Sequence, residues 1–206
     1  MLTPETHCAF EDFCDEAKKH GFEPKIESGY RSFERQLLIW NEKVSGKRKI
    51  LDKNGKPLSI DMPKLELMKT ILLWSALPGT SRHEWGTDID VIDAAAAPKD
   101  YEAELTIEES FGLFGEFHKW LDSQIESGNS SFRRVFLPGI GMVHPEPWHL
   151  SYVPEARKME QNFTAENLEE RLKNSEILLL PQILDNLEWI LDNHVFCYFE
   201  KLDFLH

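Results

Sequence analysis

The chain has 206 residues, 41% of them hydrophobic and 11% aromatic, which is enough to bury a sizeable core without a disulfide framework. Lysine and arginine number 23 against 36 aspartate and glutamate, a net charge of −13. A phosphate backbone or an anionic membrane surface would meet a repulsive field, so we expect no nucleic-acid partner.

The cysteines and the N-terminal segment indicate the compartment. Cys8 and Cys14 lie six residues apart in one expected helix and so on different faces of it, and three cysteines cannot all pair. The first residues lack the basic and long apolar regions of a secretory signal, and no stretch has the length of a membrane span. We therefore expect a cytoplasmic protein without a membrane span; a periplasmic location is the alternative.

The N-terminal part is expected to alternate helix and strand. A helix is predicted from Pro4 to His20 with Thr3 as its N-cap, followed by a short extended segment over 22–28. The run Ser32-Phe33-Glu34-Arg35 has the pattern of a capping box and begins a second helix, which continues through Trp40. This order already points to a mixed fold.

The middle of the chain adds a loop or hairpin over 45–57 with its turn at Asn54-Gly55, and a helix over 62–77. The β-branched alternation of Ile89–Ile92 predicts a strand. The spacing of the aromatic residues from Phe111 onward predicts one long amphipathic helix over 106–127 whose aromatic stripe is buried.

The last part is expected to contain strands over 132–137, 140–143 and 148–153. From residue 154 onward the sequence is charged, rich in leucine and without glycine, which is typical of helices. We therefore expect a main domain over residues 1–153 and a helical extension over 154–206 that packs on the same domain.

Two segments carry groups with metal chemistry. The first runs from Ser81 to Asp90 and contains His83; the second is Glu146-Pro147-Trp148-His149. Together they offer two imidazoles and a carboxylate, the number of protein ligands in a catalytic zinc site, and a spare glutamate to take a proton from water. A single histidine is more often a hydrogen-bonded polar residue than a metal ligand. The spacing of the motifs is therefore needed to decide whether these histidines bind a metal.

The spacing resembles a known family. His83-x6-Asp90 is preceded by Ser81, has Gly86 inside it, and is followed far downstream by Glu-x-x-His. Upstream, Ser28-Gly29-Tyr30-Arg31-Ser32 precedes Gln36. These motifs, in this order, resemble the zinc D-alanyl-D-alanine carboxypeptidases of the VanY type over roughly residues 5–153.

The resemblance implies an α+β fold of the hedgehog/DD-peptidase type, in which a small antiparallel sheet carries one zinc ion per chain and is flanked by helices. It implies that Glu146 is the general base and acid and that Arg31 polarises the scissile carbonyl. The implied metal ligands are His83, Asp90 and His149. The residues that it assigns to substrate binding are Ser81, Gln36 and Tyr30.

Other residues in or near these two segments allow more than one interpretation. Asp88 stands where the family usually carries a small apolar residue, and is either a partner of a ligand or a solvent-facing side chain. His83-Glu84 begins like the His-Glu-x-x-His of helical zinc proteases, but Thr87 occupies the place of the second histidine. His144 is expected to form the wall of the site or to support a ligand.

The predicted function is zinc-dependent removal of a C-terminal D-amino acid from peptidoglycan peptides or their fragments. A dipeptidase for D-Ala-D-Ala and a peptidoglycan endopeptidase are alternatives within the same fold. A zinc-containing binding module without turnover is the alternative from another class, although such a module needs no base beside an open metal position. A monomer is expected, and dimerisation through the leucine-rich C-terminal helices is the alternative.

Overall fold

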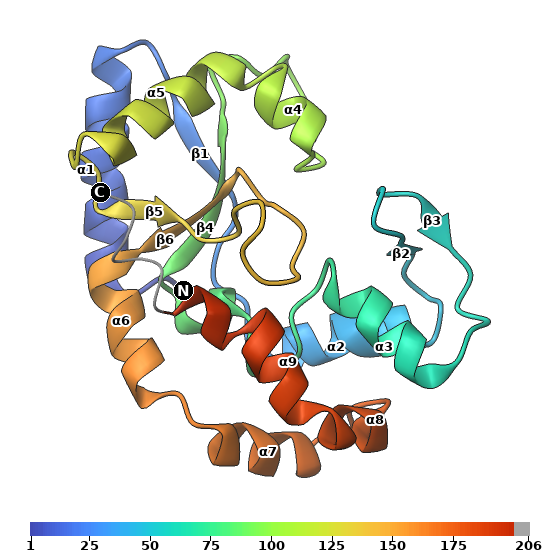
Figure 1. Cartoon of the computed structure of the whole chain (residues 1–206). Helices are drawn as coiled ribbons and strands as arrows, with labels where there is room; N and C mark the ends of the chain where they lie inside the picture. The colour runs from blue at the N-terminus through green and yellow to red at the C-terminus, as the bar shows by residue number, and fades with distance from the viewer. Residues whose placement is uncertain (200–206) are drawn as a thin grey trace.

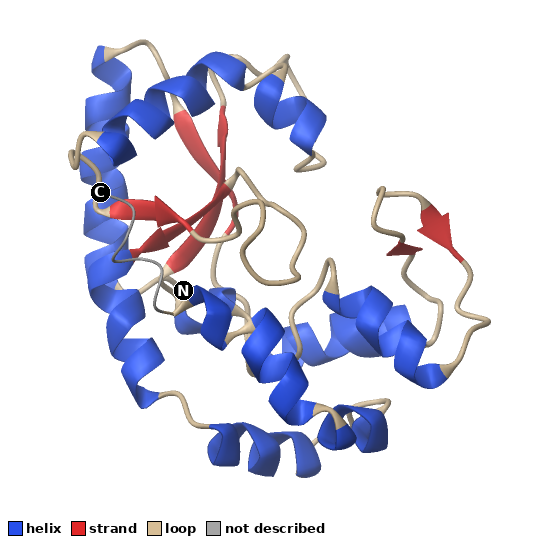
Figure 2. Cartoon of the chain, viewed as in Figure 1, coloured by secondary structure: helices blue, strands red, loops and turns tan. Residues whose placement is uncertain are grey.

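The computed structural model describes residues 1–199 and has the expected α+β architecture, with a central antiparallel sheet and helices around it (Figures 1 and 2). The strand order is β1-β4-β6-β5, and every neighbouring pair is antiparallel. The strands of this sheet are β1 (Pro24–Ser28), β4 (Asp88–Asp93), β5 (Phe132–Arg134) and β6 (His149–Tyr152).

Strand β4 lies inside the sheet, and all six of its residues are buried. Successive side chains of a strand point to opposite faces, so Ile89 and Val91 share one face and Asp88 and Asp90 share the other. Ile89 and Val91 do join an apolar core. The pairing of β4 with β6 places Asp90 directly opposite His149, which brings the two predicted metal motifs together.

Helices α1 (Pro4–Lys19) and α5 (Gly115–Glu126) cover the apolar face of the sheet (Figure 1). Thr3 caps α1 as predicted, accepting a hydrogen bond from the Thr6 amide. The core beneath these helices is aromatic: Phe13 packs against the rings of Phe117, Trp120 and Phe132 at centroid distances of 5.4–6.4 Å.

A second core lies away from the sheet, where the C-terminal helices meet the helices of the first half (Figure 1). Its buried side chains include Trp40, Met68 and Leu72 from one part of the chain and Leu172, Ile183 and Ile190 from the other. The helices that contribute are α2 (Phe33–Val44), α3 (Lys64–Leu72), α7 (Ala165–Lys173), α8 (Leu180–Asp185) and α9 (Leu187–His194).

The remaining elements are short or connect these layers. They are the hairpin of β2 (Ile50–Leu51) and β3 (Pro57–Leu58), the 3₁₀ turns η1 (Arg82–Trp85) and η2 (Phe196–Tyr198), and the helices α4 (Ile107–Phe111) and α6 (Val153–Asn162). The predicted hairpin is confirmed, and its turn includes Gly55. Among residues 1–199, no helix has the length and apolar character needed to cross a bilayer. No disulfide joins the three cysteines.

The single helix predicted over 106–127 is wrong. The chain breaks at Gly112, whose backbone leaves the helical region at φ −95° and ψ −97°, and a Cβ there would lie 2.6 Å from the Glu108 carbonyl oxygen. Thr106 and Glu109 form a capping box at the start of α4. The break turns Phe111 outward, where it is 70% exposed, although the stripe predicted it to be buried.

Further predictions differ from the structure in detail, and the strand expected over 132–137 covers only Phe132–Arg134. The helix expected over 62–77 covers only Lys64–Leu72, after which the chain turns with the Trp74 amide bonded to the Ile71 carbonyl. Ser32 caps α2 through the Arg35 amide, but an arginine at that position cannot return the bond that completes a capping box. Residues 140–143 form a loop instead of a strand, because Gly139 and Gly141 both have positive φ.

Candidate metal centre and active site

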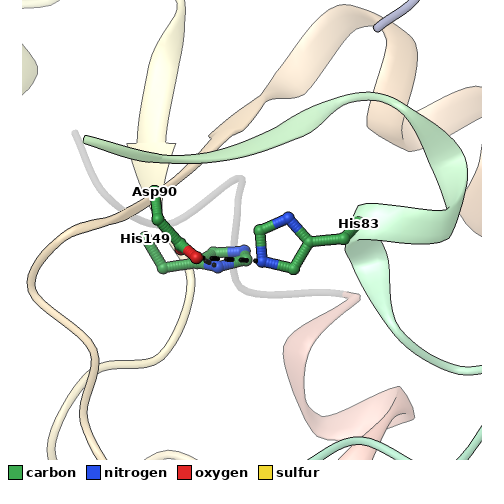
Figure 3. A group of neighbouring side chains, drawn as sticks. All are labelled: His83, Asp90 and His149. Atoms are coloured by element: carbon green, nitrogen blue, oxygen red, sulfur yellow. Dashed lines mark hydrogen bonds and ion pairs between the residues drawn. The ribbon is translucent and has the colours of Figure 1, made fainter. Parts of the chain in front are cut away.

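Three predicted ligands converge at one point beside the sheet. His83 comes from η1, Asp90 from β4 and His149 from β6, and Figure 3 shows the three side chains pointing toward one another. One ligand atom from each lies within 4.8 Å of the others, and all three residues are buried. The structure thus brings together the whole ligand set that the sequence predicted.

The local fold explains this convergence. Gly86 ends η1 in the left-handed region at φ 74°, and a Cβ there would lie 3.0 Å from the Met1 carbonyl oxygen. The chain can therefore turn sharply from the segment that carries His83 into β4. The antiparallel register between β4 and β6 then supplies His149 from the far end of the sequence.

The contacts indicate which atoms of these three residues could bind a metal. His83 Nε2 lies 3.3 Å from Asp90 Oδ2, and His149 Nδ1 lies 3.0 Å from Asp90 Oδ1. Burial alone would raise the pKa of Asp90, but the His83 charge and the hydrogen bonds from both imidazoles hold it below its usual range. Two nitrogens and one oxygen around a shared point form a donor set that fits zinc.

The second nitrogen of His149 has its own partner. Nε2 lies 3.0 Å from Asp88 Oδ1, so the ring lies between two carboxylates. Burial would lower the pKa of His149, but Asp88 and Asp90 together raise it to about 10. Asp88 is fully buried, which excludes the interpretation of this side chain as solvent-facing.

Glu146 lies beside this cluster, with Oε2 3.7 Å from His149 Nδ1. Its amide donates to the Phe136 carbonyl, which fixes the backbone before β6. Burial raises the pKa of Glu146 to about 7, with Asp90 adding to the shift while His149 and Arg31 oppose it. A carboxyl group with this pKa can both accept and return a proton near neutral pH.

Arg31 lies on the same cavity, just before α2. Its guanidinium donates to Gln36 Oε1 at 2.9 Å and to Ser28 Oγ at 3.3 Å, and its amide donates to the His83 carbonyl. Burial lowers its pKa, although Asp90 and Glu146 favour the charged form. The guanidinium is thus held in a fixed orientation beside the ligand cluster.

One cavity of about 850 Å³ is lined by His83, Asp90, His149, Glu146 and Arg31. One wall is the ring of His144 stacked on Trp74 at a centroid distance of 3.9 Å, so His144 forms the wall of the site. Another is Phe136, whose ring packs edge-on against His149. The C-terminal segment supplies a further wall, formed by His194, Val195, Tyr198 and Phe199.

The residues predicted to bind substrate occupy different positions. Ser81 is buried and lines the cavity. Gln36 is buried too, but its amide nitrogen donates to the Ala76 carbonyl and its oxygen accepts from Arg31, so its contacts hold Arg31 in place. Tyr30 is 47% exposed and is not one of the residues that line the cavity.

Two residues near the site were missed from the sequence. Arg82 is buried between Asp88 and Glu160, and no motif spacing links it to Glu160 on α6. Lys43 lines the cavity, donates to Ser75 Oγ, and has a pKa lowered to about 8 by burial. Its place on α2 carries no sequence signal, because the cavity face of that helix is defined only by tertiary packing.

Comparison with known proteins identifies the family. Residues 1–155 match the family model described as VanY, D-alanyl-D-alanine carboxypeptidase. The chain belongs to the VanY family. A D-alanyl-D-alanine carboxypeptidase of Enterococcus faecalis is 30% identical to this VanY-family chain over 146 residues, which cover 69% of the chain and 45% of the enterococcal protein. The chain thus matches less than half of that relative's length.

Solved structures of VanY proteins have the same fold. VanYB in complex with D-alanine-D-alanine is 26% identical, with a TM-score of 0.52 over 85% of this chain and 83% of that one. A variant of the D,D-pentapeptidase VanY from a VanB-type resistance cassette, in complex with Zn(II), is 26% identical, with a TM-score of 0.51 over 78% of each chain. Peptide-bond hydrolysis is therefore the general reaction of the family to which this chain belongs.

Proposed function

We propose that this VanY-family chain is a zinc-dependent carboxypeptidase that removes a C-terminal D-amino acid from peptidoglycan peptides or their fragments. One observation carries the proposal: the ligand cluster, a carboxyl group with a pKa near neutrality and a fixed guanidinium all face one cavity. The fold also supports it, since solved relatives hold Zn(II) and D-alanine-D-alanine.

His83 Nε2, the Asp90 carboxylate and His149 Nδ1 would hold the metal, one zinc ion per chain. Three protein ligands leave a fourth position open to water or substrate. A bound zinc ion supplies a Lewis acid that polarises a carbonyl and lowers the pKa of a coordinated water.

Glu146 moves the proton. Its carboxylate accepts a proton from the attacking water and returns it to the nitrogen of the leaving D-amino acid, so one group serves as base and then as acid. The position of Oε2 beside the ligand atom of His149 supports this role. Desolvation in the cavity raises the pKa of Glu146 to about 7, so its carboxylate is a stronger base toward the attacking water than an exposed glutamate would be.

Arg31 stabilises the oxygen on which negative charge develops. A guanidinium already held by Gln36 and Ser28 loses little freedom when the substrate binds, and burial strengthens its field. Ser81, which lines the same cavity, offers a hydroxyl to the end of the substrate.

The size of the cavity bears on the alternatives. About 850 Å³ lies in the upper part of the range of small-molecule sites, roughly 300–1,000 Å³, and favours a peptide over a free dipeptide. The combination of Glu146 and Arg31 at the ligand cluster argues against a binding module without turnover, because metal retention alone requires neither.

The test measures zinc content and hydrolysis in the wild type, in Glu146→Gln and in Glu116→Gln, whose carboxylate lies exposed on α5. The substrates are peptides ending in D-Ala-D-Ala, peptides ending in L-Lys-D-Ala, and free D-Ala-D-Ala. We expect one zinc per chain in all three proteins and a loss of roughly 10²–10⁴-fold in kcat for Glu146→Gln alone.

Other outcomes lead to other conclusions. Cleavage of free D-Ala-D-Ala alone would identify a dipeptidase, and cleavage within longer peptides would identify an endopeptidase. Zinc without cleavage of any wall peptide would favour the binding module. A wild type that binds no zinc would refute the proposal.

A further inference from the structure

Asp88 forms the centre of a buried polar network directly behind the metal ligands. Its side chain is fully buried and is not among the residues that line the cavity. Four groups donate to its carboxylate: His149 Nε2 at 3.0 Å, Arg82 Nε at 2.8 Å, Ser151 Oγ at 3.1 Å, and the Thr87 hydroxyl. Such a carboxylate has no access to substrate, and all its contacts are with the protein.

These contacts decide which nitrogen of His149 is available. A carboxylate paired with a guanidinium can only accept hydrogen bonds, so the nitrogen that faces Asp88 must carry a hydrogen. That nitrogen is Nε2, and the opposite nitrogen, Nδ1, is the one that lies beside Asp90. Whether the ring is neutral or charged, the hydrogen on Nε2 stays, and the lone pair for a metal arises on Nδ1.

We propose that Asp88 is a positioning residue that fixes the ring orientation and tautomer of His149 so that Nδ1 faces the metal. The inference deepens the proposed function and rests on it, because it assigns a role toward the proposed zinc ion. A carboxylate behind a histidine ligand also makes the imidazole a stronger donor, and loss of such a partner typically costs 10–100-fold in metal affinity.

The rest of the network holds Asp88 itself in place. The Arg82 guanidinium uses Nε for Asp88, one terminal nitrogen for Glu160 at 2.8 Å and the other for Ser151 Oγ at 2.8 Å. Glu160 lies on α6, so the C-terminal part of the chain is linked through Arg82 to the carboxylate behind His149. Glu160 bonds to Arg82, whereas the ion-pair partners of His149 are Asp88, Asp90 and Glu146, so Glu160 offers a matched control.

The experiment compares Asp88→Asn with Glu160→Gln. Each removes one carboxylate charge from the buried network around Arg82, but only the first changes the partner of His149. The zinc dissociation constant is measured by competition with a chromophoric chelator, and the tautomer of His149 is read from ¹⁵N-histidine NMR spectra of the zinc-loaded proteins. We expect a 10–100-fold weaker zinc affinity and a changed Nε2–H signal in Asp88→Asn, and an affinity within about threefold of wild type in Glu160→Gln.

A third variant covers the risk that a lone buried arginine prevents folding. Arg82→Met, Asp88→Ala and Glu160→Leu together replace the charged triad by apolar side chains, an exchange that is often neutral or stabilising. This folded protein is expected to share the weak zinc affinity of Asp88→Asn. Wild-type zinc affinity in either Asp88 variant, or an equal loss in Glu160→Gln, would overturn the inference while the proposed function stands; a wild type that binds no zinc would overturn both.

Discussion

Leu172 tests whether the C-terminal helices are part of the structural unit that carries the site. It is fully buried in the core that also contains Trp40, Met68 and Leu72 from α2 and α3. Leu172→Ala removes three carbon groups, about 2.4 kcal/mol of burial at 0.8 kcal/mol each. With the cavity left behind, the free energy of unfolding falls by about 3–4 kcal/mol. For a chain of this length, the melting temperature falls by roughly 6–16 °C.

The assay is urea and thermal unfolding, followed by tryptophan fluorescence and far-UV circular dichroism. Leu178→Ala is the control, because Leu178 belongs to the same C-terminal segment but is 42% exposed; it is expected to change stability by about 0.5 kcal/mol or less. The reasoning fails if Leu172→Ala shifts only a minor, separate transition and leaves the main one unchanged. That result would show that the C-terminal helices unfold on their own.

Two more predictions concern buried polar groups. Burial and the Arg134 charge lower the pKa of His118 to about 3, so the unfolded chain, but not the folded one, takes up this proton below about pH 6.5. The free energy of unfolding should therefore fall by about 2 kcal/mol between pH 7 and pH 5 because of this residue. In His118→Gln, the free energy of unfolding should not show this part of the decrease. Tyr198→Phe removes the hydroxyl that accepts from the Val143 amide and donates to the Ile140 carbonyl. We expect a loss of about 1–3 kcal/mol in stability and a several-fold lower kcat with unchanged zinc content; an unchanged kcat would mean that this loop does not position Glu146.

The sequence predicted the ligand set because its signal is local and chemical. The order and spacing of His83, Asp90 and the Glu-x-x-His segment resemble the VanY signature, and this resemblance implied the candidate ligand set. The strand predicted around Asp90 placed that residue in the sheet. The fold class followed from the same motifs. What spacing could not supply was the register that sets Asp90 opposite His149, since strand pairing depends on contacts between distant segments.

The wrong or open predictions concern residues whose positions depend on contacts between distant segments of the chain. Helical periodicity predicted a continuous helix through Gly112 and so buried Phe111, but the chain needs a break there to bring α5 onto the sheet. The role of Asp88 remained open between a ligand partner and a surface group, because its partner Arg82 is held by Glu160 on α6. Gln36 looked like a substrate contact from its motif, yet its bonds to Arg31 and to the Ala76 carbonyl occupy both ends of the amide.

The residues of the site lie on two parts of the molecule, and each part is stabilised by a different hydrophobic core. The predicted ligands Asp90 and His149 lie on the sheet, whose other face packs against α1 and α5. Glu146 instead lies at the end of a loop held from the second core and its edge: the Met142 amide donates to the Asn193 carbonyl, and the His144 amide donates to the Leu73 carbonyl. Loosening the second core should displace Glu146 before it displaces Asp90 and His149. Leu172→Ala should therefore lower kcat at a temperature where its zinc affinity still matches the wild type. Parallel loss of zinc and activity would show that the two parts act as one.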